Sequence, residues 1–588
     1  MVKIARWDVK SKLARSHPKT CDIVKILLKN RGITNAAKVK EFFHPRLESI
    51  FSLTLIKKSQ LDLTVKRITA AIAKNEQIIV YGDYDVDGIC GSAILWETIK
   101  QLGAKVMPYI PHRVDEGYGL SIRGIDNLLT AYPATRLIIT VDNGVTANEA
   151  IAYASKQKID VIVCDHHQLP AQKLTAQALV WTDQLCGAGV AWMLANSLQQ
   201  AARGKRAVSP DQSRLNQDQI GVKSGLADSH LDLVALATVA DLMPLVGANR
   251  ILLKFGLEAL KKTSRPGLQA LFAQTGINQN NITAFDIGHI IAPRLNASGR
   301  LESAMDALRL ICTTDSARAQ MLARALSDLN TARRNLTLQA YNHARIMAAS
   351  QNGSRFLLLA HESWQEGIIG LVASRVVEEF YLPTVVIARG ETISKGSARS
   401  VSGFNIIEAL RIHQDLFIDI GGHPMAAGFT IKTEKIAILA KRLNDYSRKV
   451  LTVERLTKTL AVDCQIPATL INEELAQGLV GFEPFGIGNP EPIFLTRDLV
   501  IENARTVGSE SQHLKLVVSP DQSRLNQDQI GVSDQLSGIR WEAIGFGMGH
   551  RINEIKVGGE IDVVYSLAVN FWNNQERLQL KLKDVKVS

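Results

Sequence analysis

Short apolar runs alternate with helical segments between residues 55 and 245, and this alternation restricts the fold more than any other feature of the chain. The runs are QIIVYG, KVMPYI, RLIITV, DVIVC and ALVWT. A short continuous apolar run is typical of a strand that is buried on both faces, and helices between such strands form the crossovers of a parallel sheet. The sequence therefore predicts an α/β domain with a parallel sheet over residues 55–245.

Acidic and imidazole side chains follow several of these apolar runs. They are Asp83, Asp85 and Asp87 in VYGDYDVDG, Asp142 in LIITVDNG, Asp165, His166 and His167 in VIVCDHH, and Asp241 in LATVADLMPL. Since the carboxyl ends of parallel strands meet at one edge of the sheet, we expect these side chains to form one cluster.

Such a cluster favours divalent cations. Carboxylates that gather without a counter-charge raise one another's pKa, and two cations remove that penalty. Two cations about 3.5–4 Å apart also clamp both sides of a phosphoryl displacement. Oxygen donors with one or two imidazoles suit Mn²⁺ or Mg²⁺ better than structural zinc. His166 and His167 could each ligate a metal, orient the attacking water or protonate the leaving oxygen. A metal-dependent hydrolase is the leading hypothesis.

Each motif has a simpler interpretation when it is taken alone. A DxDxDG sequence also occurs in calcium loops, but an EF-hand loop that starts at Asp83 needs glutamate where Ile94 stands. Asp142 alone could cap a helix, and Asp241 alone could be a turn residue before Pro244. It is the conjunction of the motifs within one domain that favours the metal site.

The remaining chain divides by its pattern. Residues 246–350 have helical periodicity and are expected to form a connector, and residues 351–452 contain a second, smaller α/β module. Residues 453–588 have many short alternating strands, which favours an OB-like β-barrel. Residues 1–54 form a basic N-terminal segment, whose first 50 residues hold twelve Lys and Arg against four Asp and Glu. This segment suits a polyanion such as nucleic acid, or is a solvated basic face.

A fifteen-residue sequence, VSPDQSRLNQDQIGV, occurs twice, at residues 208–222 and 518–532. It is polar and interrupts two unlike patterns, so we interpret the copies as insertions into surface loops, where extra length costs little. A duplicated binding motif is the alternative.

Composition is that of a globular protein, with 46% hydrophobic and 21% charged residues. There is no uninterrupted apolar run of about 18 residues, so no membrane span is expected. The six cysteines are scattered, with no CxxC pair, which favours thiols in a reducing cytoplasm over disulfides or a zinc site.

The order GDYDVDG, VDNG, CDHH and VADLMPL resembles the DHH phosphoesterase family, in its RecJ branch of single-strand-specific 5′→3′ DNA exonucleases. The resemblance continues in APRLNASGRLESA (292–304), GSARSVSGFN (396–405), GGHPMAAGF (421–429) and FEPFGIGNPEPIF (482–494). It implies a parallel-sheet DHH domain (55–245), a helical connector, a DHHA1-type substrate-binding domain (351–452) and an OB-like nucleic-acid-binding domain (453–588).

The resemblance also implies roles for individual residues. The metal ligands would be Asp83, Asp85, Asp87, Asp142, His166 and Asp241, and the catalytic group would be Asp165, His166 and His167. The DNA phosphates would contact Arg294, Ser298, Arg300, Ser397, Arg399, Gly422 and His423.

The chemistry of these residues agrees with that assignment. Gly421, Gly422 and His423 offer backbone N–H groups and a donor side chain for an anion, although an ordinary glycine turn would look the same. Arg399 beside Ser397 suits a phosphate, unless it is a solvated arginine. Arg294 and Arg300, expected in one loop, could serve the same purpose or could complement a helix end.

We therefore expect a Mn²⁺- or Mg²⁺-dependent exonuclease, with two cations, that degrades single-stranded DNA from a free 5′ end to 5′-mononucleotides in recombination, mismatch repair and base-excision repair. The resemblance implies a single-strand-binding protein and a RecQ-type helicase as partners, and we expect a cytoplasmic monomer. The alternatives are a DHH-family phosphodiesterase on short oligonucleotides or cyclic dinucleotides, and a DNA-binding scaffold with a decayed site.

Overall fold

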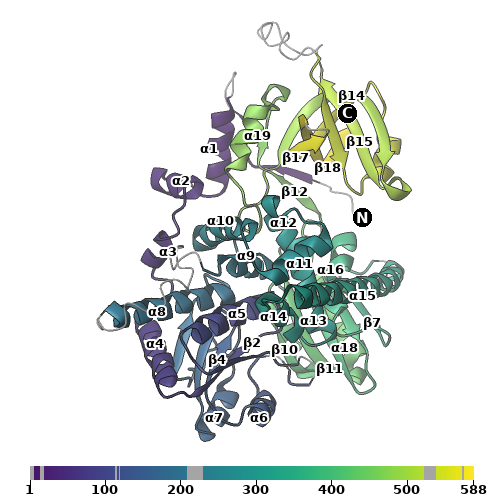
Figure 1. The fold of residues 1–588 in the computed structure, drawn as a ribbon. Helices are drawn as coiled ribbons and strands as arrows, with labels where there is room; N and C mark the ends of the chain where they lie inside the picture. The colour runs from purple at the N-terminus through teal and green to yellow at the C-terminus, as the bar shows by residue number, and fades with distance from the viewer. Residues whose placement is uncertain are drawn as a thin grey trace. The chain divides into compact units, whose positions relative to one another are not determined.

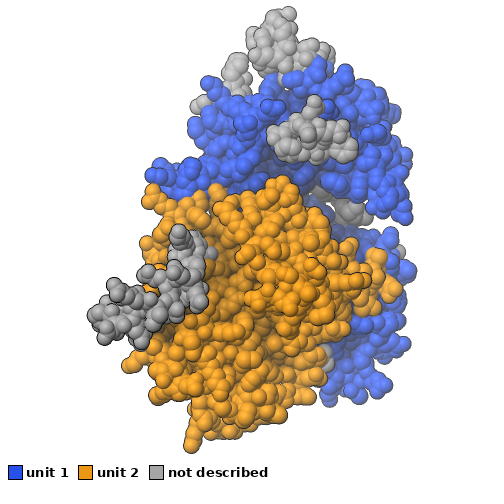
Figure 2. Space-filling model, in the orientation of Figure 1, with its two compact units in different colours: residues 1–44, 340–485, 489–588 blue, residues 45–339, 486–488 orange. Residues whose placement is uncertain are grey.

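The computed structural model describes residues 6–13, 19–112, 115–117, 119–207, 229–351, 353–521, 538–572 and 575–587. The chain forms two compact units, which Figure 2 shows in different colours. One comprises residues 45–339 and 486–488, and the other comprises residues 1–44, 340–485 and 489–588.

A five-stranded sheet in the order β3-β2-β4-β5-β6 forms the centre of the first unit, and every pair in it is parallel. Its strands are β2 (Gln77–Gly82), β3 (Val106–Tyr109), β4 (Thr135–Val141), β5 (Asp160–Asp165) and β6 (Ala178–Trp181). All six residues of β2 are buried, which explains its continuous apolar run. The predicted α/β fold with a parallel sheet is confirmed.

Helices cover this sheet and extend its core. Helix α5 (Val86–Gln101), which follows β2, packs against α8 (Gly187–Ala207) and α9 (Leu231–Ala240), and twelve of its residues are buried. The other described helices between residues 45 and 246 are α3 (Ser49–Ser52), α4 (Lys58–Ala73), α6 (Ile122–Ala131) and α7 (Asn148–Lys156).

The predicted connector is helical throughout its described elements. They are α10 (Gly247–Lys261), α11 (Pro266–Thr275), the 3-10 helix Gln279–Asn281, α12 (Ala284–Asp286), the π-helix Ile287–Ile291, α13 (Ala292–Leu301), α14 (Met305–Cys312) and α15 (Ser316–Ser350). The prediction that Arg294 and Arg300 lie in a loop is wrong, because both residues lie on helix α13. Pro293 stands in the first turn of this helix, where proline is tolerated.

A second five-stranded sheet, in the order β10-β11-β9-β8-β7, belongs to the other unit. Its strands are β7 (Leu357–His361), β8 (Thr384–Ala388), β9 (Ile393–Arg399), β10 (Phe417–His423) and β11 (Ala426–Lys432). Only β7 and β8 pair in parallel. The associated helices are α16 (Ile369–Phe380), α17 (Ile406–Arg411) and α18 (Ile436–Val450), with short 3-10 turns at Gln414–Leu416 and Thr433–Lys435. This is the smaller α/β module that the sequence predicted.

The C-terminal strands close into a barrel, because β14 pairs with both β15 and β17 in the ring β14-β15-β16-β18-β17 (Figure 1). Their bounds are β14 (Phe494–Val507), β15 (His513–Pro520), β16 (Trp541–Gly545), β17 (Glu560–Trp572) and β18 (Gln575–Val587). β13 (Cys464–Gln465), α19 (Glu473–Val480) and the 3-10 turns Ala468–Leu470, Ser509–Ser511 and Gly549–Glu554 accompany it. A closed ring of five strands confirms the expected OB-like barrel.

The N-terminal residues pack with this barrel instead of standing alone. Strand β1 (Arg6–Val9) pairs in parallel with β12 (Thr459–Val462). Helices α1 (Thr20–Asn30) and α2 (Ala36–Phe43) contribute Ile23, Leu27 and Phe42 to the apolar cluster that contains Phe482. Residues 45–54 belong to the other unit, so the predicted segment 1–54 is divided between the two.

The first copy of the repeated sequence, residues 208–222, lies outside the described residues, as does all of the second copy after Asp521. The second copy begins at the end of β15, whose partner β16 is antiparallel to it. Across the described parts of the chain, no helix is both long enough and apolar enough to cross a bilayer.

Candidate metal centre and substrate-binding residues

The acidic side chains of the predicted cluster come from strand ends and from the ends of two helices. Asp83 follows β2, and Asp85 is the N-cap of α5 and accepts hydrogen bonds from the backbone N–H groups of Asp87 and Gly88. Asp142 follows β4 with a positive φ of 62°. Asp241 differs from the sequence expectation, because it is the C-cap of helix α9 and does not follow a strand.

His166 lies at the centre of the cluster. Its Nε2 atom is 3.1 Å from Asp142 Oδ1, 3.6 Å from Asp87 Oδ2 and 3.6 Å from Asp241 Oδ2. Three overlapping groups place one ligand atom per residue within 4.8 Å of one another. They are Asp83, Asp85 and Asp142; Asp87, His166 and Asp241; and Asp142, His166 and His167. All six predicted metal ligands are therefore brought together.

Burial and mutual repulsion dominate the electrostatics of these acids. Burial, followed by the charges of Asp87, Asp85 and Asp83, raises the pKa of Asp142 well above its ordinary value. Burial and the charge of Asp87 raise the pKa of Asp85, and burial with Asp87 and Asp85 raises the pKa of Asp241 to about 8. Without a counter-charge, the cluster resists full ionisation.

Two buried atoms at the centre of this cluster lack hydrogen-bond partners among the described residues, namely Asp142 Oδ1 and His166 Nε2. Buried polar atoms normally have hydrogen-bond partners. Two buried atoms without such partners, 3.1 Å apart, therefore indicate that these side chains bind a ligand. Carboxylate oxygens with one imidazole nitrogen form the donor set of Mn²⁺ or Mg²⁺. The residues present therefore fit divalent cations.

Both carboxylate oxygens of Asp165 accept hydrogen bonds from N–H groups. Its Oδ1 accepts the backbone N–H groups of His166 and His167 and lies 2.8 Å from His167 Nδ1, and its Oδ2 accepts the N–H of Val145. Burial opposes protonation of His167, but the bond and charge of Asp165 outweigh it and raise the pKa of His167 to about 9. Asp165 thus orients the imidazole of His167 and stabilises its protonated form.

Asp87 also caps the beginning of helix α8, a role that the sequence did not indicate. Its two carboxylate oxygens accept the backbone N–H groups of Gly187 and Ala188, at 2.6 and 2.7 Å, at the beginning of α8. A Cβ on Gly187 would lie 2.7 Å from the Cβ of Asp142. The glycine in LCGAGV was the available signal for this close approach.

Helix α13 packs on the acidic loop. Asn296 Oδ1 accepts the N–H of Val86 at 3.0 Å, and a Cβ on Gly299 would collide with the carbonyl oxygen of Tyr84. Neither contact was foreseen, although both residues stand in the APRLNASGRLESA motif.

The three predicted phosphate contacts on α13 differ in their surroundings. Arg294 Nη1 donates to the carbonyl of Ile290, and its Nε has no hydrogen-bond partner among the described residues. Arg300 is half-buried. Ser298 is only 1% exposed, and its hydroxyl donates to the carbonyl of Leu295.

The other predicted phosphate contacts lie in the second unit, on β9 and β10, which β11 separates in the sheet. His423 is opposite Ala426, and Ala426 is opposite Arg399, so the three side chains share one face of the sheet. Arg399 Nη1 donates to Ser397 Oγ at 3.1 Å. Gly422 has a φ of 151°, and a Cβ there would collide with Ala427.

Arg399 carries an unneutralised charge. Burial lowers its pKa, and no carboxylate of the described residues opposes that effect. A Cβ on Gly370, near the beginning of α16, would lie 3.0 Å from Arg399 Nη2. A half-buried guanidinium beside a hydroxyl and a helix N-terminus provides three kinds of donor for an anion.

Family models match three separate parts of the chain. These are residues 77–238 (DHH family, N-terminal domain), 353–449 (DHHA1 domain) and 462–584 (RecJ OB domain).

Curated relatives are similar over most of their length. The single-stranded-DNA-specific exonuclease RecJ of Bacillus subtilis is 32% identical, over 96% of this chain and 68% of the relative. That of Salmonella typhimurium is 31% identical, over 90% of each. The crystal structure of RecJ in complex with Mn²⁺ from Thermus thermophilus has a TM-score of 0.77 and 27% identity, over 99% of this chain and 79% of that one. The chain belongs to the RecJ family of single-stranded-DNA-specific exonucleases.

Proposed function

We propose that this protein is a Mn²⁺- or Mg²⁺-dependent exonuclease that hydrolyses single-stranded DNA from its 5′ end to 5′-mononucleotides. The observation that carries the proposal is the buried cluster in which His166 Nε2 lies within 3.6 Å of three carboxylates. Membership of the RecJ family supports the substrate.

Two cations would be held by Asp83, Asp85, Asp87, Asp142, His166 and Asp241. Asp142 and His166 each belong to two of the three ligand groups, and Asp142 is the proposed shared ligand because a carboxylate has two oxygens with which to bridge two cations. Bound there, the cations would acidify a water molecule and offset the charge of the scissile phosphate. The carboxylates supply fixed negative charge, and α8 fixes Asp87 through two N–H groups.

His167 is the proposed proton donor. Its Nδ1 lies 2.8 Å from Asp165 Oδ1, and this carboxylate favours the protonated imidazole. Cleavage that yields a 5′-mononucleotide breaks the bond between phosphorus and the 3′ oxygen of the terminal nucleotide. Protonation of that oxygen by His167 would help it leave.

Arg399, Ser397, Gly422 and His423 would hold a DNA phosphate on the face that these strands share. Arg294 and Arg300 would contact further phosphates. The Ser298 hydroxyl is buried and already donates within α13, which supports a packing role for it. The OB-like barrel would bind the rest of the single strand by stacking and charge.

Several finer assignments rest on the family alone. We propose action in recombination, mismatch repair and base-excision repair in the cytoplasm, as a monomer, with a single-strand-binding protein and a RecQ-type helicase as partners.

The test uses a single-stranded oligonucleotide labelled at its 3′ end, with Mn²⁺ added or chelated. A metal-dependent ladder that shortens from the 5′ end, and that blunt duplex does not give, is the expected result. Turnover of dinucleotides without cleavage of long strands would contradict the proposal and favour the small-substrate phosphodiesterases.

A further inference from the structure

Leu242 directly follows Asp241, one of the proposed metal ligands, and its side chain is 66% exposed. Its φ is 57°, in the left-handed region. Among the exposed large apolar residues of the described chain, Leu242 alone has a positive φ. The residue therefore combines two unfavourable features, which are an apolar side chain in solvent and a backbone conformation that residues with a bulky side chain avoid.

The left-handed turn has a structural purpose, because it ends helix α9 as a Schellman motif. The N–H of Leu242 donates to the carbonyl of Val239, and the N–H of Met243 donates to the carbonyl of Thr238. The turn also brings the Met243 side chain into the apolar core. Glycine is the usual residue at this position, since it adopts a positive φ without strain. The turn therefore explains the backbone of Leu242 but not its side chain.

The acid cluster is open to solvent on the side of Asp241 and His167. Their side chains are 28% and 38% exposed, whereas Asp87 and Asp142 are buried. A scissile phosphate would reach the cations from this open side. Because Leu242 is the neighbour of Asp241, the bases next to that phosphate would then lie beside the exposed leucine.

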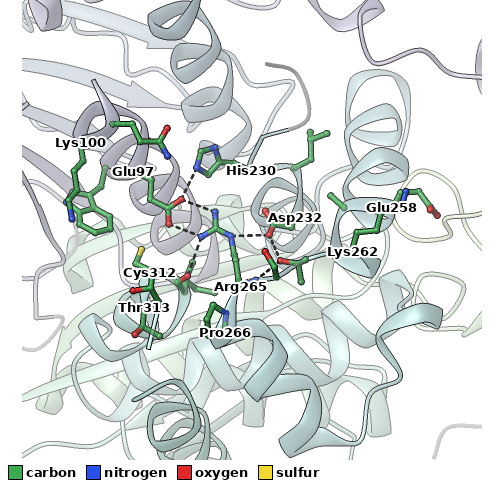
Figure 3. Close-up of a pocket in the computed structure, with 18 of the residues that line it drawn as sticks. Glu97, Lys100, His230, Asp232, Glu258, Lys262, Arg265, Pro266, Cys312 and Thr313 are labelled. Atoms are coloured by element: carbon green, nitrogen blue, oxygen red, sulfur yellow. Dashed lines mark hydrogen bonds and ion pairs between the residues drawn. The ribbon is translucent and has the colours of Figure 1, made fainter. Parts of the chain in front are cut away.

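The backbone that carries Leu242 is fixed relative to α5. Helix α9, which ends just before Leu242, is anchored at its beginning, where Asp232 accepts a hydrogen bond from Arg265 at 3.0 Å. Arg265 also donates to Glu97 of α5, at 2.7 and 2.9 Å. Figure 3 shows Arg265 between the two carboxylates. Since the first turn of α5 carries Asp87, the leucine is presented beside the cluster by rigid elements.

We propose that the side chain of Leu242 packs against a base that flanks the scissile phosphate. Every DNA base has a flat face on which a side chain can pack whatever the sequence, and a nuclease that degrades a whole strand needs contacts of that kind. Strained residues persist where function requires them, and this contact gives the leucine such a role. The inference rests on the proposed exonuclease function, and it adds a base contact to a site whose other proposed contacts are with phosphates and cations.

Three substitutions separate substrate contact from stability. Leu242→Ala should lower kcat/KM for single-stranded DNA about tenfold, as the loss of an apolar contact does, and should leave the unfolding temperature nearly unchanged. Leu242→Gly should lower kcat/KM as much but unfold about 1–4 °C higher, because glycine relieves the strain. Leu242→Met, which keeps an apolar side chain, should retain most activity. Asn75→Gly, at the corresponding left-handed position after α4, is the control and should keep the unaltered kcat/KM.

The contact itself is tested with oligonucleotides that lack one base, at the first, second or eighth position from the 5′ end. For the unaltered protein, removal of the base that Leu242 contacts should lower kcat/KM for release of the terminal nucleotide about tenfold. For Leu242→Ala the same removal should have no further effect, because both changes delete one interaction. Removal of the eighth base is the control and should affect both proteins equally.

Two results would overturn the inference. One is an unchanged kcat/KM in Leu242→Ala. The other is a loss in Leu242→Ala that adds in full to the loss from each missing base, since additive effects show that the two groups do not touch. Both results leave the proposed function intact, because that function fails only if the unaltered protein does not shorten the strand in the presence of Mn²⁺.

Discussion

Asn296 holds the first turn of α5 through one hydrogen bond, in which its Oδ1 accepts the N–H of Val86 across 210 positions of sequence. Val86 is fully buried and stands between Asp85 and Asp87. The bond therefore ties α13 to the loop that carries the acids.

Asn296→Ala should leave the Val86 N–H buried and unsatisfied, at a cost of about 1–3 kcal/mol in the free energy of unfolding. Because the loop also positions Asp85 and Asp87, the affinity for Mn²⁺ should fall as well. Thermal unfolding and Mn²⁺ titration check both effects. Asn280→Ala, at an exposed turn, is the control. An unchanged Mn²⁺ affinity in Asn296→Ala would show that the bond does not position the acids.

Asp142→Asn should lower activity by about a thousandfold or more, since it takes away the proposed shared ligand and leaves only residual catalysis. In chelator the same variant should unfold at a higher temperature than the unaltered protein. The reason is that burial and the charges of Asp87, Asp85 and Asp83 all disfavour ionised Asp142. Scanning calorimetry with chelator and the nuclease assay with Mn²⁺ measure the two effects. A lower unfolding temperature would mean that the carboxylate stabilises the metal-free fold.

The metal-free protein should lose stability as pH rises. Asp241 has a pKa of about 8 in the folded state, above its ordinary unfolded value near 3.9. The folded state therefore binds more protons between these values, and its stability falls from about pH 4 towards pH 8. Urea unfolding in chelator at pH 5, 6, 7 and 8 would follow this trend, and Asp241→Asn should flatten it. Saturating Mn²⁺ should weaken the slope, because bound cations favour the ionised carboxylates.

Arg399→Ala should weaken binding of single-stranded DNA by about tenfold to a hundredfold, the loss of about 1.5–3 kcal/mol from a charged hydrogen bond. Arg399→Lys should recover only part of this, since an ammonium group lacks the planar fork of guanidinium. Fluorescence anisotropy in chelator separates binding from cleavage. Arg411→Ala, exposed on α17, is the comparison, and an equal loss there would indicate a general charge effect.

The parallel sheet that carries the acids could be predicted because each of its strands is recognisable from a short stretch of sequence. Strands buried on both faces, such as β2, need continuous apolar runs, and the rule that sites lie at the carboxyl ends of parallel strands placed Asp83 and Asp142 together. Asp241 joined the same cluster from a helix end, which the pattern around it did not distinguish from a strand end.

Other features depend on distant partners and leave little trace in a local pattern. The run RLNASGR contains residues that form helices poorly, so it indicated a loop, yet contacts of Asn296 and Gly299 with the acidic loop stabilise it as helix α13. Likewise, nothing near Asp87 indicates that it caps a helix that begins at Gly187, a hundred positions later. Tertiary contacts decided both cases.

The pairing of β1 with β12 has a consequence for synthesis. Val9 lies opposite Val462, so the first strand emerges from the ribosome 453 residues before its partner. At about 5–20 residues per second, that interval is roughly 20–90 s. Residues 45–339 can bury their own core in that time. Ile23 and Leu27 stay exposed until the barrel has been synthesised. The apolar side chains of α1 are thus made long before the barrel that covers them, and a chaperone would have that interval in which to bind them.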